Sequence, residues 1–95
     1  MVRLHAIVGG RVQGVGYRYF VHHAAERLHI TGVVRNSLDG TVEVEAEAPD
    51  RLQLEALLRD LRTGPSASEV ERVEEQWEED EDVNAKPRYF GFRVM

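Results

Sequence analysis

Apolar residues recur along this chain with two periods, one typical of strands and one typical of helices. Strand-like alternation is clearest at residues 41–48, where Val or Ala occupies every second position and Thr or Glu the others. An Asp39-Gly40 turn precedes this run, which predicts a hairpin with a strand at residues 33–37. Residues 2–9 predict a further strand. One face of such a sheet is covered and the other meets water.

Two segments carry the apolar stripe of an amphipathic helix instead. The first helix is expected from about Arg18 to Thr31-Gly32, and the second from Asp50 to Gly64-Pro65. Their stripes are Val21, Ala24, Ala25 and Leu28 in the first and Leu54, Leu57, Leu58 and Leu61 in the second. Asp50 is a good N-cap, and Gln53 three positions later predicts a capping box with it.

Two more strands are expected near the end of the chain, at residues 69–78 and 89–95. The run of five acids at residues 78–82 repels itself too strongly to be buried and predicts a loop between them. The order β-α-β-β-α-β-β matches the split βαβ plan. We therefore expect an α+β, ferredoxin-like sandwich (βαββαβ) over residues 1–95, a single domain whose antiparallel sheet carries both helices on one face.

The net charge and composition of the chain limit the kinds of partner that it can bind. The 95 residues carry a net charge of −5, which divides into +4 over residues 1–36 and −9 over residues 37–95. An acidic chain is a poor general binder of nucleic acid, although its positive first third could attract a small anion. There is no cysteine and no apolar run long enough to cross a membrane, so a cytoplasmic protein is expected.

The segment GGRVQGVGYRYF, residues 9–20, is the candidate for chemistry. It fails three familiar motifs. Val15 stands where a P-loop needs Lys, Tyr19 stands where a dinucleotide fingerprint needs Gly or Ala, and no serine lies in a hydrolase elbow. The segment still leaves a strand and enters a helix, where glycines let successive N–H groups point into one concavity. With Arg18 at the helix start it is either an anion cradle or a structural turn beside a surface arginine.

Residues 10–18, GRVQGVGYR, closely resemble the first signature of the acylphosphatase family, Gly-x-Val-Gln-Gly-Val-x-Phe/Tyr-Arg. Residues 32–36 followed by residues 39–43, GVVRN and DGTVE, resemble the second signature, and the resemblance extends over nearly the full chain. Three positions depart from the family pattern without being expected to touch phosphate. They are Val33 for an aromatic residue, Ala48 for a frequent glycine and His29 for a helix-end glycine.

The resemblance implies hydrolysis of acyl phosphates to a carboxylate and inorganic phosphate, without metal or other cofactor. It implies that Arg18 and the loop backbone grip the phosphoryl oxygens and that Asn36 orients the attacking water. The implied phosphate-binding residues are Gln13, Gly14, Val15, Gly16, Tyr17 and Arg18. The expected partner is the small-molecule acyl phosphate alone, bound by a monomer that contacts neither nucleic acid nor membrane.

Two other functions stay open at this point. The same fold could serve as a non-catalytic domain that binds an anion or metabolite, because fold alone does not specify function. RNA binding on the open sheet face is disfavoured by the glutamates of residues 41–48. His22, Glu26 and His29 share a helix face at spacings that could bind metal, but a solvated face explains them more simply.

Overall fold

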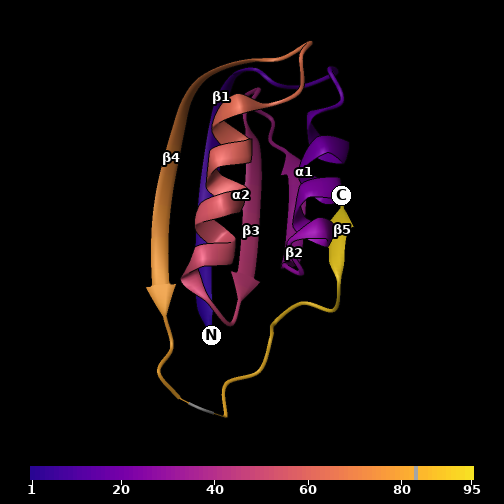
Figure 1. The fold of residues 1–95 in the computed structure, drawn as a ribbon. Coiled ribbons are helices and arrows are strands. Elements are labelled where there is room, and N and C mark those ends of the chain that lie inside the picture. The colour runs from indigo at the N-terminus through magenta and orange to yellow at the C-terminus, as the bar shows by residue number, and fades with distance from the viewer. Residues whose placement is uncertain (83) are drawn as a thin grey trace.

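The fold was examined in a computed structural model that describes residues 1–82 and 84–95. Its elements run β1, α1, β2, β3, α2, β4 and β5 along the chain (Figure 1). Their bounds are Val2–Arg11, Tyr17–Arg27, Thr31–Asn36, Val42–Ala48, Arg51–Thr63, Glu69–Glu79 and Phe92–Val94. All seven predicted elements are present, so the α+β, ferredoxin-like plan is confirmed.

The five strands form one sheet in the order β4-β1-β3-β2-β5. Three of the four pairings are antiparallel, as predicted, but β5 pairs parallel with β2, so the sheet is mixed and the prediction of an antiparallel sheet was wrong at this edge. The predicted last strand, 89–95, is also shorter, because only Phe92–Val94 pairs. A crossing from one edge of the sheet to the other brings β5 into register beside Gly32, Val33 and Val34.

Both helices lie on one face of the sheet (Figure 1). The core fills the space between them and the sheet, and it contains the predicted leucine stripe of α2 and most of the α1 stripe. Asp50 is the N-cap of α2 as predicted, but the predicted capping box with Gln53 does not form. The Asp50 carboxylate accepts a hydrogen bond from the Leu52 N–H, but the Gln53 amide donates to the Leu28 carbonyl at 2.8 Å. Gln53 therefore satisfies an orphan carbonyl at the end of α1 and ties the two helices together.

His29 has a left-handed backbone, with φ of 58°. It follows the end of α1, where its N–H and that of Ile30 bond back to carbonyls of the last helical turn. A left-handed position at a helix end favours glycine, since a residue with a Cβ is strained there.

Glu47 is a carboxylate buried on the open face of the sheet, where it is only 1% exposed. Its two oxygens accept hydrogen bonds from the main-chain N–H groups of Arg88 and Tyr89, at 2.9 and 2.7 Å. The Arg3 guanidinium lies 3.5 Å from the same carboxylate. Glu47 therefore holds the segment that crosses from β4 to β5 against the middle of the sheet.

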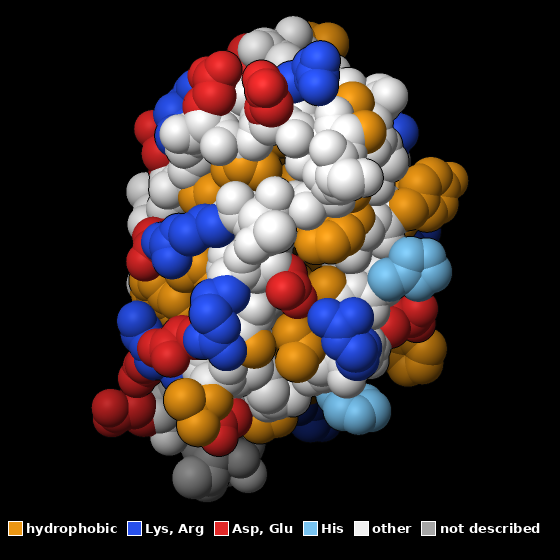
Figure 2. Space-filling view, turned by 45° about the horizontal axis from the view of Figure 1, so that its top comes forward, with side chains coloured by type: hydrophobic (Ala, Val, Ile, Leu, Met, Phe, Trp, Pro, Cys, Tyr) orange, Lys and Arg blue, Asp and Glu red, His pale blue; other side chains and the backbone are white. Residues whose placement is uncertain are grey.

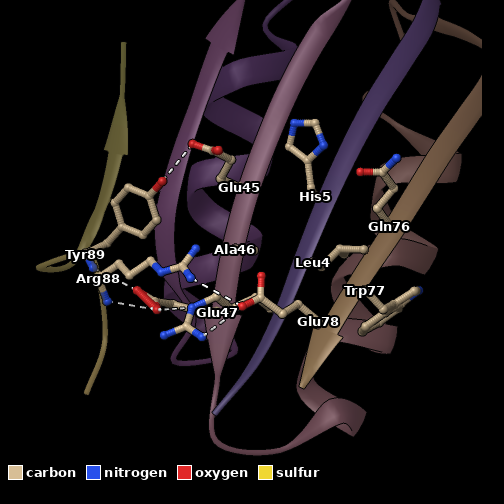
Figure 3. Close-up of a pocket in the computed structure, with 11 residues that line it drawn as sticks. Leu4, His5, Glu45, Ala46, Glu47, Gln76, Trp77, Glu78, Arg88 and Tyr89 are labelled. Atoms are coloured by element: carbon tan, nitrogen blue, oxygen red, sulfur yellow. Dashed lines mark hydrogen bonds and ion pairs between the residues drawn. The ribbon is translucent and has the colours of Figure 1, made fainter. Parts of the chain in front are cut away.

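Tyr89 adds a second tether, because its hydroxyl donates to the Glu45 carboxylate at 2.7 Å (Figure 3). Burial and this carboxylate raise the pKa of Tyr89 to about 12, which keeps the phenol protonated as a donor. Val33, which is adjacent to Glu45 in the ladder, is only 5% exposed although its side chain belongs to the open face.

The acidic run at residues 78–82 was predicted to be a loop, but Glu78 and Glu79 still pair with β1 as the end of β4, so the loop begins later than predicted. Glu78 lies within 3.8 Å of the Arg3 guanidinium and 3.3 Å of that of Arg88, which offsets part of the repulsion between the acids. In the part of the chain that the structure describes, no helix is long and apolar enough to cross a membrane.

Replacing Glu47 by Gln is expected to destabilise the protein by roughly 2–3 kcal/mol, because an amide cannot accept both main-chain N–H bonds and leaves Arg3 without its buried counter-charge. Urea unfolding measures the change. Glu74→Gln on the exposed face of β4 is the matched control and should change stability by less than about 0.5 kcal/mol. Equal stability of the two variants would contradict the tether.

Candidate functional site

The glycine-rich loop between β1 and α1 contains two left-handed residues. Gly14 has φ of 74° and Gly16 has φ of 79°, and a Cβ built at either would meet no heavy atom within 4 Å. Backbone angle rather than crowding therefore requires glycine at both positions. These two residues turn the chain so that the loop curves over the start of α1.

The main-chain N–H groups of this loop are left without protein acceptors. Within residues 1–82 and 84–95, none of the N–H groups from Gly14 to Tyr19 donates a hydrogen bond to another protein group. Gly16 is the N-cap of α1, and no side chain caps the helix there. Three of these donors belong to the first turn of the helix, where the helix dipole is positive, and three to the loop before it. Such a set of donors is suited to an anion.

Gln13 fixes the loop to the β2–β3 hairpin. Its side-chain amide donates to the Ser37 carbonyl at 2.8 Å and to the Thr41 carbonyl at 2.9 Å. Both amide hydrogens are therefore engaged, and only the main-chain N–H of Gln13 can reach a ligand. The hairpin turn itself is closed by Asp39, whose carboxylate accepts bonds from the Thr41 N–H and hydroxyl, and these bonds lower the pKa of Asp39.

Tyr17 fixes the other end of the loop to the core. Its ring is 1% exposed, and its hydroxyl donates to the Leu61 carbonyl of α2 at 2.7 Å. Burial raises the pKa of Tyr17, so the phenol remains a neutral donor. Tyr17 therefore orients the start of α1 with its side chain, and only its N–H faces the loop.

Arg18 and Asn36 line one small cavity together with Gly14 and Gly16. The cavity has a volume of about 80 Å³, and its remaining walls are Val12, Tyr17 and Tyr19. Arg18 is the second residue of α1, and Asn36 is the last residue of β2. Residues eighteen positions apart in the sequence therefore meet at the end of the sheet from which the loop and hairpin project (Figure 1).

The Arg18 guanidinium donates to the main-chain oxygen of Met95 at 2.5 Å. Met95 is held in turn by its own N–H, which bonds the Val34 carbonyl. The residue that follows the parallel strand β5 thus contacts Arg18, which is part of the cavity wall. In the described residues no hydrogen bond uses the side-chain amide of Asn36, which leaves that amide available to a ligand or water.

Five of the seven predicted site residues lie in the walls of one cavity, namely Gly14, Gly16, Tyr17, Arg18 and Asn36. Gln13 and Val15 lie in the same loop but do not line it. Tyr19 and Met95 were not predicted as site residues. The one sequence signal for Tyr19 was its position directly after Arg18. Val33 is not among the lining residues, so this departure from the family pattern lies outside the cavity wall.

Two larger hollows lie elsewhere. One of about 240 Å³ is on the open face of the sheet, beside Glu47 and Arg88 (Figure 3). The other, of about 270 Å³, lies between the Asp39 turn and Arg72 of β4. Neither contains Arg18 or Asn36. In the described ranges, no three His, Cys, Asp or Glu side chains converge as metal ligands would, and His22 instead lies 3.4 Å from Glu26.

Comparison with known proteins agrees with this geometry. The family model described as Acylphosphatase matches residues 4–91. The chain belongs to the acylphosphatase family. It is 44% identical over 92 residues to an acylphosphatase of Salinibacter ruber, covering 97% of this chain and 90% of that one. It is 42% identical over 95 residues to an acylphosphatase of Geobacillus thermodenitrificans, covering 100% and 95%.

Among solved structures, the crystal structure of acylphosphatase from Bacillus subtilis superposes with a TM-score of 0.87 at 32% identity, over 100% of this chain and 99% of that one. These relatives decide between the two functions left open by the sequence. The chain is an acylphosphatase, an enzyme that hydrolyses acyl phosphates, rather than a non-catalytic binding domain.

Gln13→Glu is expected to lower acylphosphatase activity at least ten-fold and to weaken inhibition by inorganic phosphate, because a carboxylate would face two carbonyl oxygens and push the loop from the hairpin. Steady-state kinetics and a thermal melt measure the two effects. The control Gln76→Glu, on the exposed face of β4, should leave the activity unchanged. Full activity in Gln13→Glu would show that the amide does not position the loop.

Proposed function

We propose that the loop from Gln13 to Arg18 holds the phosphoryl group of the acyl phosphate and that Asn36 orients the attacking water. The observation that carries this proposal is the cavity of about 80 Å³ whose walls include Arg18, Asn36 and both left-handed glycines. The cavity is far smaller than the roughly 300–1,000 Å³ of pockets that enclose organic ligands, so its size suits a small anion.

Phosphate binding follows from the donors around this cavity. The unpaired N–H groups of the loop and of the first turn of α1 supply fixed hydrogen bonds, and the helix dipole adds positive potential. The Arg18 guanidinium supplies a full charge and a planar pair of donors. Because these groups are held before substrate arrives, they can stabilise charge on the phosphoryl oxygens with little reorganisation.

In the step in which water attacks the phosphorus, Asn36 acts from the opposite wall of the cavity. Its amide would hold the water oxygen in line with the bond from phosphorus to the acyl oxygen. Attack forms the new P–O bond, the P–O(acyl) bond breaks with its electron pair, and a carboxylate leaves. The water proton passes to a phosphate oxygen. Since a carboxylate is a stable leaving group, positioning and electrostatics suffice without a general acid.

Metal independence is part of this proposal, since every role falls to the loop, Arg18 and Asn36. A monomeric state, a cytoplasmic location and the lack of a nucleic-acid partner stay predictions. Figure 2, which brings the loop end forward, shows acidic, basic and apolar side chains interspersed rather than one basic field.

Arg18→Ala is expected to reduce kcat/KM for benzoyl phosphate by roughly 100-fold or more and to abolish competitive inhibition by inorganic phosphate, because it removes the one charged side chain among the described residues of the cavity wall. Arg27→Ala, at the other end of α1, removes an equal charge and should retain activity. Circular dichroism checks that both variants fold. An active, phosphate-inhibited Arg18→Ala enzyme would sink this role for the arginine.

Asn36→Ala is expected to lower kcat by roughly 100-fold while leaving the inhibition constant of inorganic phosphate within about two-fold, since the amide orients water rather than the phosphate. Asn36→Asp, which keeps the shape but not the donor, tests the amide itself. The measurements are steady-state rates and phosphate inhibition. If Asn36→Ala instead lost phosphate inhibition and kept its rate at saturation, the residue would be a phosphate ligand.

A further inference from the structure

The exposed apolar residues of this protein gather near the cavity. In residues 1–82 and 84–95, five large hydrophobic side chains are exposed, namely Tyr19, Leu38, Leu52, Phe90 and Met95. Three of them adjoin the site. Tyr19 lines the cavity, Met95 contacts Arg18 through its main chain, and Leu38 follows Asn36 by two residues on the hairpin turn.

The cavity is too small for a whole substrate. Its volume is about 80 Å³, whereas pockets that enclose organic ligands measure roughly 300–1,000 Å³. If the phosphoryl group occupies it, the acyl group must project through its mouth. Whatever lies at the mouth therefore contacts the part of the substrate that differs from one acyl phosphate to another.

Tyr19 is the large apolar side chain of the cavity wall that is exposed to solvent. It is 62% exposed, whereas the neighbouring Tyr17 ring is buried and Phe20 packs partly against the core. Because Tyr19 directly follows Arg18 on the first turn of α1, its ring starts one residue from the guanidinium that would hold the phosphate. An exposed aromatic ring at this place offers a flat apolar surface to the acyl group.

We propose that Tyr19 is a specificity-determining residue whose ring packs against the acyl group and favours acyl phosphates with an uncharged, apolar acyl part. This inference rests on the proposed function, since it needs the phosphoryl group beside Arg18. The acyl groups it favours are aromatic or branched aliphatic rather than short or anionic, because only an apolar group gains from covering the ring.

The test compares two substrates that share the phosphate and differ in the acyl part. Benzoyl phosphate and acetyl phosphate are assayed with the unaltered enzyme, Tyr19→Ala, Tyr19→Phe and Leu52→Ala. Tyr19→Ala should lower the benzoyl-to-acetyl ratio of kcat/KM by roughly three- to ten-fold. Tyr19→Phe keeps the ring and should keep the ratio. Leu52→Ala removes an exposed apolar side chain at the start of α2 and should change nothing.

Inorganic phosphate inhibition is measured in every variant, because it reports the cavity without the acyl group. An unchanged inhibition constant with a lowered ratio supports the inference. An equal fall for both substrates, or an unchanged ratio, overturns it. Tyr19→Gln replaces the alanine variant if that one does not fold. Failure of the proposed function would give a different result. The Arg18→Ala enzyme would then keep both turnover and phosphate inhibition, whatever the benzoyl-to-acetyl ratio of the Tyr19 variants.

Discussion

The side-chain amide of Gln13 is the interaction on which the geometry of the site depends. Its two hydrogens bond the Ser37 and Thr41 carbonyls, on either side of the hairpin turn. Asn36 is adjacent to Ser37, and Gly14 is adjacent to Gln13. One amide group therefore sets the distance between the glycine loop and the asparagine opposite it. The main-chain N–H groups of the loop donate to no other protein group that the structure describes. Without the Gln13 bonds, the loop would not be held against the hairpin.

The order of the strands brings the glycine loop and the β2–β3 hairpin to the same end of the sheet. β3 lies between β1 and β2 and runs antiparallel to both, so β1 and β2 run in the same direction. Both strands therefore end at the same end of the sheet. The loop after β1 and the hairpin after β2 thus meet over the end of β3. Tyr17 and its bond to Leu61 then hold the loop from the helix side. Core packing and two side-chain bonds therefore hold a loop whose own backbone is unpaired.

Local pattern was enough to predict the elements and the loop, because helical and strand periods and turn residues are local signals. Three features could not be predicted in this way. The direction of β5, the partner of Gln53 and the depth of Glu47 depend on segments far apart in the chain. Glu47 is the clearest case, since its alternation with Val44 and Ala46 predicts a solvated glutamate until Arg88 and Tyr89 cross over it.

The place of β1 also sets the order in which the protein can fold. β1 pairs with β3 on one side and with β4 on the other, so that Leu4 is opposite Trp77. Forming contacts between residues so far apart in the sequence costs loop-closure entropy in the folding transition state, and this cost slows folding. During synthesis, the strand that leads into the glycine loop keeps one edge unpaired until β4 has left the ribosome. The earliest part of the enzyme to be made is therefore among the last to be completed, and its bare edge is exposed to aggregation in the interval.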